Sequence, residues 1–187
     1  MDTSTTLQTV LTKIHSFSPA QIGVFCSTPV EKQIKRKGIL LHEGQTCNFV
    51  AIILKGSFRT YNQEQNQTLN FFTEKDWVAD HDSFIKQQPS ANIIEAGEDS
   101  EIAVLSIQKL HQLIKADPAF LVLAKVLGGL TKPAELSSYS ISPAEKYNEL
   151  MLKHPDWILR FSQKHLASYL GMTPETFSRL KRKCLFS

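Results

Sequence analysis

The feature that most constrains the fold is a block of short apolar runs between about residues 31 and 105. Within this block hydrophobic residues alternate with polar ones or form short runs, and polar turn residues separate the runs. This pattern is typical of β-strands joined by tight turns, with Gly44 and Gly56 placed at turns. The block is therefore expected to fold as a small all-β barrel or jelly roll. The predicted strands cover residues 38–41, 49–54, 57–61, 68–72, 92–95 and 101–105.

Helical periodicity flanks this block on both sides. A helix is expected over residues 5–15, and the capping box Ser18-Pro19-Ala20-Gln21 starts a second one that runs to about residue 26. After the block, Ser106 is placed to cap a further helix. A second capping box, Ser142-Pro143-Ala144-Glu145, opens another helix nearer the C-terminus.

The segment that begins at Asp117-Pro118 is predicted to be an apolar helix. It carries more apolar residues than one face packed against a sheet needs. Such an excess fits either a dimer interface or simple packing on the barrel, and the sequence leaves both open. Gly128, Gly129 and Pro133 are expected to weaken or kink this helix.

The overall composition excludes several classes of protein. Of the 187 residues 42% are hydrophobic, enough for a sizeable core, and a formal charge of +3 is too small for a disordered polyelectrolyte. The three cysteines, Cys26, Cys47 and Cys184, are widely spaced and odd in number, which excludes a disulfide framework or a paired-cysteine metal site. No apolar run approaches the ~18 residues of a membrane span, and the first residues lack a signal-sequence pattern. A cytoplasmic protein with no membrane segment is expected.

The charge is concentrated at the C-terminus. Residues 153–187 contain seven Lys or Arg and two Asp or Glu, a net charge of +5. The preceding 152 residues contain 14 basic and 16 acidic residues, a net charge of −2. A nearly neutral body with a basic end suggests that the end meets an anion, of which nucleic acid is the commonest, although a solvated basic helix end would give the same count.

Residues 161–183, FSQKHLASYLGMTPETFSRLKRK, form a helix-turn-helix pattern. Ser162 is a good N-cap, and Gly171 can adopt the left-handed conformation that ends a first helix. Thr173 caps a second helix with Pro174 at its first position. Ala167 allows the two helices to approach closely, as a steep crossing requires.

The second helix of this pattern, about residues 174–183, presents a polar and cationic face. A helix in the major groove reads base edges with its N-terminal residues and holds phosphates with flanking cations. Two amphipathic helices that merely close a bundle would explain the apolar face but not the cations on the polar one. The residues predicted to contact DNA are Ser162, Lys164, Thr173, Glu175, Thr176, Ser178, Arg179, Arg182 and Lys183.

These residues resemble the Crp/Fnr superfamily of bacterial transcription regulators. The closest correspondence is SPAEKYNELMLKHPDWILRFSQKHLASYLGMTPETFSRLKRK, and a weaker one rests on FVAIILKGSFRTY, the turn glycines and Pro89-Ser90-Ala91. The resemblance implies an α+β fold with a cyclic-nucleotide-binding-like jelly-roll barrel and N-terminal helices at residues 1–116. A connecting and dimerising helix at 117–140 and a helix-turn-helix, winged-helix-like domain at 141–187 would follow.

The resemblance also implies a function and partners. Family members read the operator with the start of the recognition helix, and Glu175, Thr176 and Arg179 match those positions. Pro174 stands where an arginine is common, so the preferred DNA sequence should differ, and any wing after the recognition helix is expected to be minimal. The implied partners are a second copy of the chain, double-stranded DNA with an inverted-repeat operator and, as a candidate, RNA polymerase.

The barrel departs from the pattern that would bind a cyclic nucleotide. The family holds the ribose with a Glu and the phosphate with an Arg-Ser-Ala cassette, whereas Ala79 lies about where the Glu would be and Pro89 replaces the Arg. Lys86 is a nearby cation that would have to substitute. A standard cyclic nucleotide is therefore not expected, and another small ligand or an empty barrel both remain open. The candidate pocket residues are Ala79, Asp80, Ser90 and Ala91.

Two other classes of function stay open at this stage. A cupin-like metal-dependent enzyme would need two histidines one residue apart on a strand, but the barrel offers only His42 and His81, so an enzyme is not predicted. An interaction scaffold without DNA binding would leave the basic C-terminus unexplained. Three dispersed cysteines do not supply an iron–sulfur cluster, and His81 among carboxylates is typical of a solvated loop, so no metal or cofactor is expected.

Overall fold

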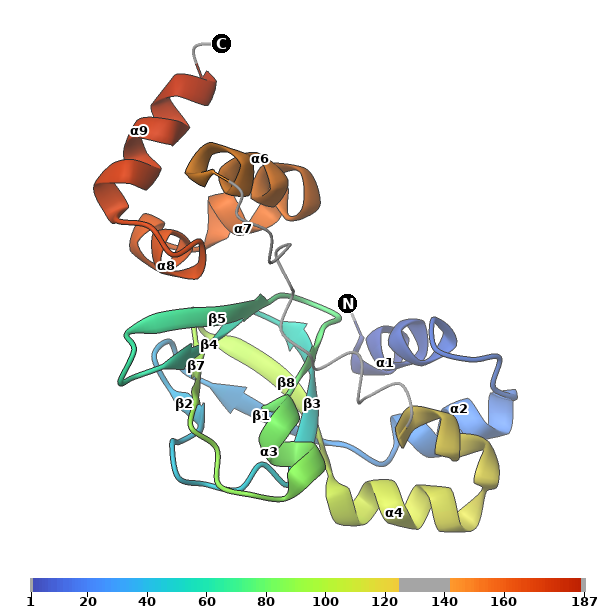
Figure 1. Cartoon of the computed structure of the whole chain (residues 1–187). Helices are drawn as coiled ribbons and strands as arrows, with labels where there is room; N and C mark the ends of the chain where they lie inside the picture. Colours follow the sequence, from blue (N-terminus) through green and yellow to red (C-terminus); the bar gives the residue numbers. More distant parts are fainter. Residues whose placement is uncertain (1, 125–141, 186–187) are drawn as a thin grey trace. The chain divides into compact units, whose positions relative to one another are not determined.

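A computed structural model describes residues 2–124 and 142–185 of the chain (Figure 1). The chain divides into two compact units. Unit 1 comprises Met1–Thr60 and Phe72–Lys132, and unit 2 comprises Tyr61–Phe71 and Pro133–Ser187. The domain boundaries predicted after residues 116 and 140 stay a prediction.

Two helices open unit 1. α1 (Thr3–Thr12) buries Leu7, Val10 and Leu11, and α2 (Pro19–Cys26) begins with the predicted capping box. In that box Gln21 N donates to Ser18 Oγ, while Ser18 N donates to the Gln21 side chain. α1 ends three residues earlier than predicted, and beyond its end the Ile14 N–H donates to the Leu11 carbonyl at 3.0 Å, the i→i−3 spacing of a tighter turn.

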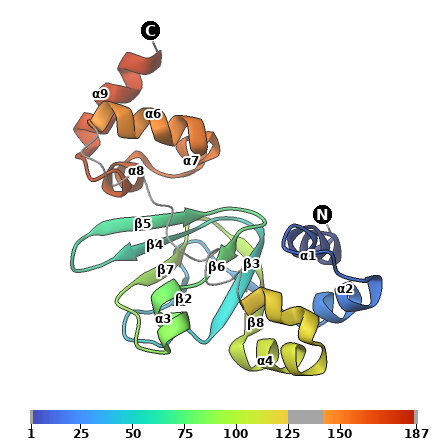
Figure 2. The same ribbon diagram turned by 45° about the vertical axis from the view of Figure 1, so that its right-hand side comes forward.

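Eight strands form the β structure in two four-stranded sheets (Figure 2). The strand orders are β1-β8-β3-β6 and β2-β7-β4-β5. The β barrel or jelly roll and the α+β class predicted from the sequence are therefore confirmed. All six predicted strands are present to within one residue at each end. The strands are β1 (Val30–Ile34), β2 (Ile39–Leu41), β3 (Phe49–Lys55), β4 (Phe58–Asn62), β5 (Gln67–Phe72), β6 (Trp77–Val78), β7 (Ile93–Ala96) and β8 (Ser100–Ser106).

Three elements within the block were not predicted. β1 is almost wholly exposed and its sequence VEKQI is polar, so it lacks the apolar alternation of a strand. It forms by pairing with β8, from Val30 opposite Val104 to Ile34 opposite Ser100. β6 has only two residues, and α3 (His81–Lys86) has six, both too short for a periodic signal.

The core of unit 1 surrounds the central strands β3 and β8. Val50, Ala51, Ile52 and Ile53 of β3 are all buried, because this strand has neighbours on both sides and is covered on both faces. Gly56 after β3 has a φ of +102°, and an added Cβ there would lie 2.1 Å from Ser100 Oγ. The glycine is thus required both by backbone conformation and by space.

A helical segment follows the last strand, as predicted. Ser106 caps α4 (Ile107–Ala116), whose Leu110 and Leu113 are buried. Asp117 then caps the short helix η1 (Pro118–Phe120), and its carboxylate also accepts a 2.7 Å hydrogen bond from Gln21 Nε2 of α2. Figure 1 shows α1, α2 and α4 gathered beside the strands. The remainder of the predicted dimerising helix, with Gly128, Gly129 and Pro133, lies outside the described residues.

Unit 2 contains four helices in the described part of residues 133–187. They are α6 (Pro143–Lys153), α7 (Pro155–Arg160), α8 (Gln163–Tyr169) and α9 (Pro174–Leu185). The predicted capping box at Ser142 and Glu145 starts α6, with both of its hydrogen bonds formed. The core of the unit includes Leu150, Trp157 and Leu166, and Phe71 of β5 belongs to it. Over the described residues, no helix combines the length and hydropathy that a membrane crossing requires.

Candidate nucleic-acid interface

The candidate interface is built on α8 and α9. The Ser162 side chain caps α8 by accepting from the His165 N–H at 3.2 Å, as predicted. Leu166 and Ala167 of α8 are fully buried, so this face of the helix packs into the core of unit 2. A side chain as small as that of Ala167 lets a neighbouring helix approach closely.

The turn between the two helices depends on Gly171. Its φ is +66°, a left-handed conformation that glycine adopts without steric cost. The Met172 N–H donates to the Ala167 carbonyl at 2.9 Å, and the Gly171 N–H donates to the Ser168 carbonyl at 3.1 Å. These two bonds form a Schellman motif, which satisfies the last carbonyls of α8 and turns the chain sharply.

α9 begins at this turn and divides into two faces. Its N-terminus is capped by Thr173, whose Oγ1 accepts from the Thr176 N–H at 3.3 Å. Phe177 is fully buried and meets the Tyr147 ring edge-on, with ring centroids 5.3 Å apart. Leu180 is partly buried against the same core. The apolar side of α9 therefore faces inward, and its polar side is left for solvent or a partner.

The polar side of α9 pairs an acid with a base near its N-terminus. Glu175 and Arg179 are both exposed and lie one helical turn apart. The Glu175 backbone N–H and the Thr173 side chain hydrogen-bond the Glu175 carboxylate, and these contacts, with the charge of Arg179, lower the pKa of that carboxyl. Glu175 is thus an ionised hydrogen-bond acceptor at neutral pH.

The structure brings the nine predicted DNA-contacting residues into one unit, on two adjacent helices and their caps. Ser162 and Lys164 are exposed at the start of α8, and Arg182 and Lys183 are exposed near the end of α9. Thr176 and Ser178 are half-buried, because they lie where the polar side of α9 meets its apolar side. The assignment of these residues to DNA contact stays a prediction.

Sequence reasoning missed α7, which packs against α8 in the core of unit 2. Trp157 of α7 lies in the aromatic cluster of unit 2, with the Tyr169 ring 5.6 Å away and nearly perpendicular. The His154 ring stacks on Trp157 at 3.9 Å. Pro155 at the first helical position and Arg160 in the last turn were the available signals for this helix. Burial raises the pKa of Tyr169 to about 12.

Three of the four candidate pocket residues of the barrel are buried. Ala79, Asp80 and Ser90 are all buried and lie together, whereas Ala91 is exposed. Asp80 Oδ1 accepts from the Ser83 N–H at 2.8 Å, and Asp80 Oδ2 lies 3.0 Å from Ser90 Oγ. The carboxylate of this region is therefore engaged with protein groups.

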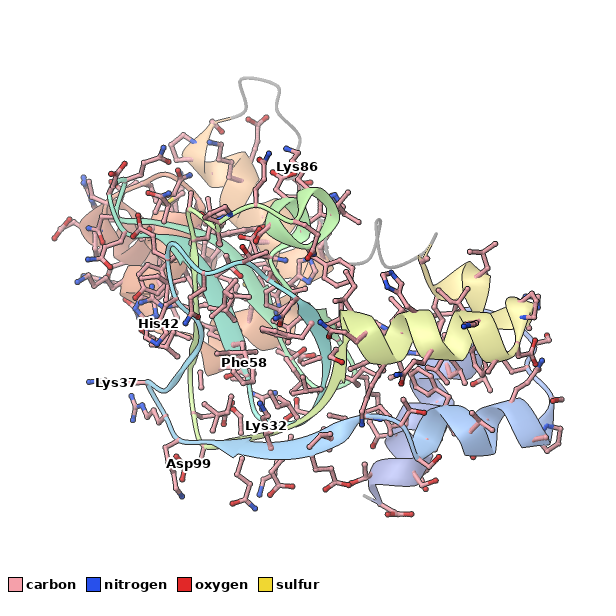
Figure 3. All side chains as sticks on the ribbon, turned by 90° about the horizontal axis from the view of Figure 1, so that it is seen from below. Lys32, Lys37, His42, Phe58, Lys86 and Asp99 are labelled. Carbon is pink, nitrogen blue, oxygen red and sulfur yellow. The ribbon has the colours of Figure 1, made fainter. Side chains whose placement is uncertain are left out.

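The cation considered from the sequence does not reach this carboxylate. Lys86 forms an ion pair with Asp82, one turn earlier on α3, at 3.2 Å, and its side chain is 59% exposed. Figure 3 shows Lys86 at the periphery, on α3. Pro89, in the position of the expected arginine, is exposed and supplies no charge.

Among the residues whose side chains the structure describes, neither the cysteines nor the histidines assemble into a metal site. Cys47 is fully buried, and burial raises the pKa of its thiol to about 11, although hydrogen bonds with the Asp80 and Phe49 backbones act in the opposite direction. Burial also raises the pKa of Cys26. In the described ranges, no three His, Cys, Asp or Glu side chains are grouped so that they could hold a metal ion. The cupin-like alternative therefore gains no support.

Known proteins resemble this chain both in the barrel and in the fold as a whole. A family model described as the cyclic nucleotide-binding domain matches residues 31–117, from β1 through α4. No curated protein sequence is significantly similar to the chain. FixK2 from Bradyrhizobium japonicum has a similar structure, with a TM-score of 0.70, 18% identity, and coverage of 83% of this chain and 84% of its own.

Two further solved structures agree. CLP of Xanthomonas campestris, described as a c-di-GMP responsive global regulator, has a TM-score of 0.65 at 15% identity, over 90% of this chain and 92% of its own. The catabolite activator protein of Thermus thermophilus has a TM-score of 0.56 at 18% identity, over 91% and 84%. The chain therefore has the same fold as FixK2, CLP and the catabolite activator protein, and its residues 31–117 match the model of the cyclic nucleotide-binding domain.

Proposed function

We propose that the chain is a DNA-binding transcription regulator of the Crp/Fnr type and not an enzyme. The observation that carries this proposal is the pair α8 and α9, joined by the Schellman turn at Gly171, with the apolar side of α9 buried and its other side polar and cationic. Two helices that only closed a bundle would have no need for cations on the outer side. The regulator relatives FixK2, CLP and the catabolite activator protein support the same general kind of function.

In this proposal α9 is the recognition helix of a helix-turn-helix and enters the major groove. Arg179 pairs bidentately with guanine O6 and N7, and Glu175 accepts from cytosine N4. Arg182, Lys183 and Lys164 contact phosphates. The smaller polar residues at the two caps, Ser162 and Thr173, with Thr176 and Ser178, complete the interface.

The chain is proposed to act as a homodimer on an inverted repeat. Two symmetric recognition helices contact half-sites about one helical turn, ~34 Å, apart. The segment expected to join the protomers, residues 117–140, is mostly outside the described part of the chain. The protein is further proposed to act in the cytoplasm and to contact RNA polymerase.

The barrel is proposed to work without a standard cyclic nucleotide. Asp80 is engaged internally, Pro89 supplies no charge, and Lys86 is paired with Asp82 at the surface. A different small ligand would have to bind at the candidate pocket residues, which are Ala79, Asp80, Ser90 and Ala91.

The test is a selection of duplexes from random DNA with the full chain, followed by binding measurements on variants. Arg179→Ala should lose ~1 to 3 kcal/mol on the selected operator and relax the preference at one G·C pair. Lys183→Ala should weaken binding to all duplexes alike. It should also reduce the dependence of the binding constant on salt concentration by the amount expected for the loss of about one phosphate contact.

Lys37→Ala, which removes an exposed lysine of unit 1, is the matched control and should leave binding unchanged. If Arg179→Ala kept both the affinity and the base preference of the wild type, the assignment of the recognition helix would be wrong. Weak binding to every duplex, insensitive to salt, would instead favour an interaction scaffold.

A further inference from the structure

A buried hydrogen-bond network in unit 1 converges on one carboxylate. Asp80 is 5% exposed, and three groups surround its side chain: the Ser83 N–H at 2.8 Å, the Asn92 amide at 2.8 Å and the Ser90 hydroxyl at 3.0 Å. The Ser90 hydroxyl also lies 2.9 Å from the Asn92 carbonyl, so two acceptors share its single proton. The three groups that hydrogen-bond the Asp80 carboxylate here are a backbone N–H, a primary amide and a hydroxyl, all of them neutral.

The network joins segments that are distant in the sequence. Asp80 precedes α3, Ser90 lies in the turn after α3, and Asn92 stands directly before β7. Ser83, also buried, extends the network because its Oγ accepts from the Cys47 N–H at 2.8 Å and donates to the Gln88 carbonyl. The charge of Asp80 therefore holds the turn of residues 87–92 against the start of α3.

The chemistry of the three groups around Asp80 is that of an anion site. A backbone N–H, a hydroxyl and a primary amide supply directed hydrogen bonds that suit a carboxylate or a phosphate. In this chain the carboxylate comes from the protein itself. An external phosphate at the same place would have to displace Asp80 or lie beside its negative charge, which like-charge repulsion opposes.

We propose that Asp80 is an internal anion, which fills the hydrogen-bonding site between α3 and β7 and holds the turn of residues 87–92 in place without any phosphate-bearing effector. The barrel has the fold that is named for cyclic nucleotide binding. In this chain a carboxylate of the protein itself occupies the hydrogen-bonding site. This inference concerns unit 1 alone, so its test is independent of whether unit 2 binds DNA.

The test uses anion rescue in the full chain. Asp80→Ala removes the carboxylate that accepts from the Ser83 N–H and the Asn92 amide, and it leaves the Ser90 hydroxyl with the Asn92 carbonyl as acceptor, so the midpoint of thermal unfolding of unit 1 should fall by roughly 5 °C or more. Formate or inorganic phosphate at about 0.1 M should recover much of this loss compared with chloride at equal ionic strength, because a bound anion stabilises the folded state. The wild type should show no such effect, and it should release no heat when titrated with phosphate or cyclic AMP.

Asp82→Ala is the matched control, since Asp82 is an exposed carboxylate in the first turn of the same helix. It loses only a surface ion pair with Lys86 and should shift the midpoint by less than about 2 °C, with no response to formate. Asp80→Asn and Ser90→Ala provide milder variants if Asp80→Ala does not fold. Asp80→Asn should be less stable than the wild type without recovery by formate, because its amide fills the space but turns a donor toward Ser90 and Asn92.

Three results would overturn the proposal. One is binding of phosphate or cyclic AMP by the wild type with Asp80 in place. Another is an unchanged unfolding midpoint in Asp80→Ala, or in Asp80→Asn and Ser90→Ala if the first variant does not fold. The last is a destabilised Asp80→Ala that neither formate nor phosphate restores, which would make Asp80 a structural acceptor with no anion site around it.

Discussion

At the scale of single residues, burial in unit 1 favours the neutral form of an ionisable side chain. Cys47 shows this well: its N–H donates to Ser83, its thiol lies 3.3 Å from the Phe49 carbonyl, and its side chain is fully buried. Burial disfavours the thiolate, which is why the pKa of Cys47 rises to about 11 from an ordinary value of 9.0. Such a thiol is a core group and a poor nucleophile at neutral pH.

This pKa makes the stability of unit 1 depend on alkaline pH. The folded state favours the protonated thiol, so the contribution of Cys47 is complete below pH 9 and is lost as the pH rises toward 11. The free energy of unfolding should fall by roughly 2 to 3 kcal/mol over that range. Urea unfolding at several pH values measures it, and Cys47→Ala should show a flatter profile between pH 9 and 11. An identical fall in the wild type and in Cys47→Ala would contradict this account.

The role of Asp80 could be predicted from the sequence only in part. The sequence marks it as a pocket residue, but its three partners come from positions 83, 90 and 92, which only folding brings together. Similarly, the sequence suggests that Lys86 is a cation near the cassette, whereas the structure pairs it with Asp82 at the surface.

At the scale of elements, local signals predicted helix ends accurately. The capping boxes at Ser18 and Ser142 both form, and Gly171 ends α8 as expected. These signals are reliable because a cap is made by residues within a few positions of one another. β1 carries no comparable local signal, since its pairing partner β8 lies about 70 residues further along the chain.

Two glycines allow a matched test of the turn between α8 and α9. Gly171 has a positive φ, so Gly171→Ala forces a side chain into the left-handed region and should destabilise unit 2 by ~1 to 2 kcal/mol. Gly23 lies inside α2 with nothing within 4 Å of an added Cβ, so Gly23→Ala should stabilise unit 1 by ~0.4 to 1 kcal/mol.

The two substitutions are chemically the same and are expected to have opposite signs. Thermal unfolding measures both, and DNA binding by Gly171→Ala should weaken while binding by Gly23→Ala is unaffected. Equal stability changes in the two variants would mean that the left-handed turn does not position α9.

At the scale of the whole molecule, the described residues form two units with separate cores. One large cluster includes Phe25, Trp77 and Ile102, and a smaller cluster includes Trp157, Leu166 and Phe177. The chain has two tryptophans in total, one in each cluster and both nearly buried. Each unit therefore has its own fluorescent reporter.

Core substitutions should act on the unit that contains them. Leu166→Ala removes a fully buried side chain and should destabilise unit 2 by ~2 to 5 kcal/mol, shifting the unfolding transition of Trp157. Ile102→Ala should do the same in unit 1 and shift the transition of Trp77. Urea unfolding of each variant with the other tryptophan replaced by Phe measures the two transitions. Equal shifts of both reporters in each variant would show one cooperative unit instead of two.

The sequence by itself determined the β block with six of its strands, the capped helices, and the separation of a nearly neutral body from a cationic end. Those features depend on periodicity, caps and composition, which are local properties of the chain. Only the tertiary structure shows that β1 pairs with β8 and that α7 shares the core of unit 2 with α8. It also shows that Asp80 forms hydrogen bonds with Ser90 and Asn92. Each of these requires contacts between distant segments or within elements too short to carry a period, so no local pattern could specify them.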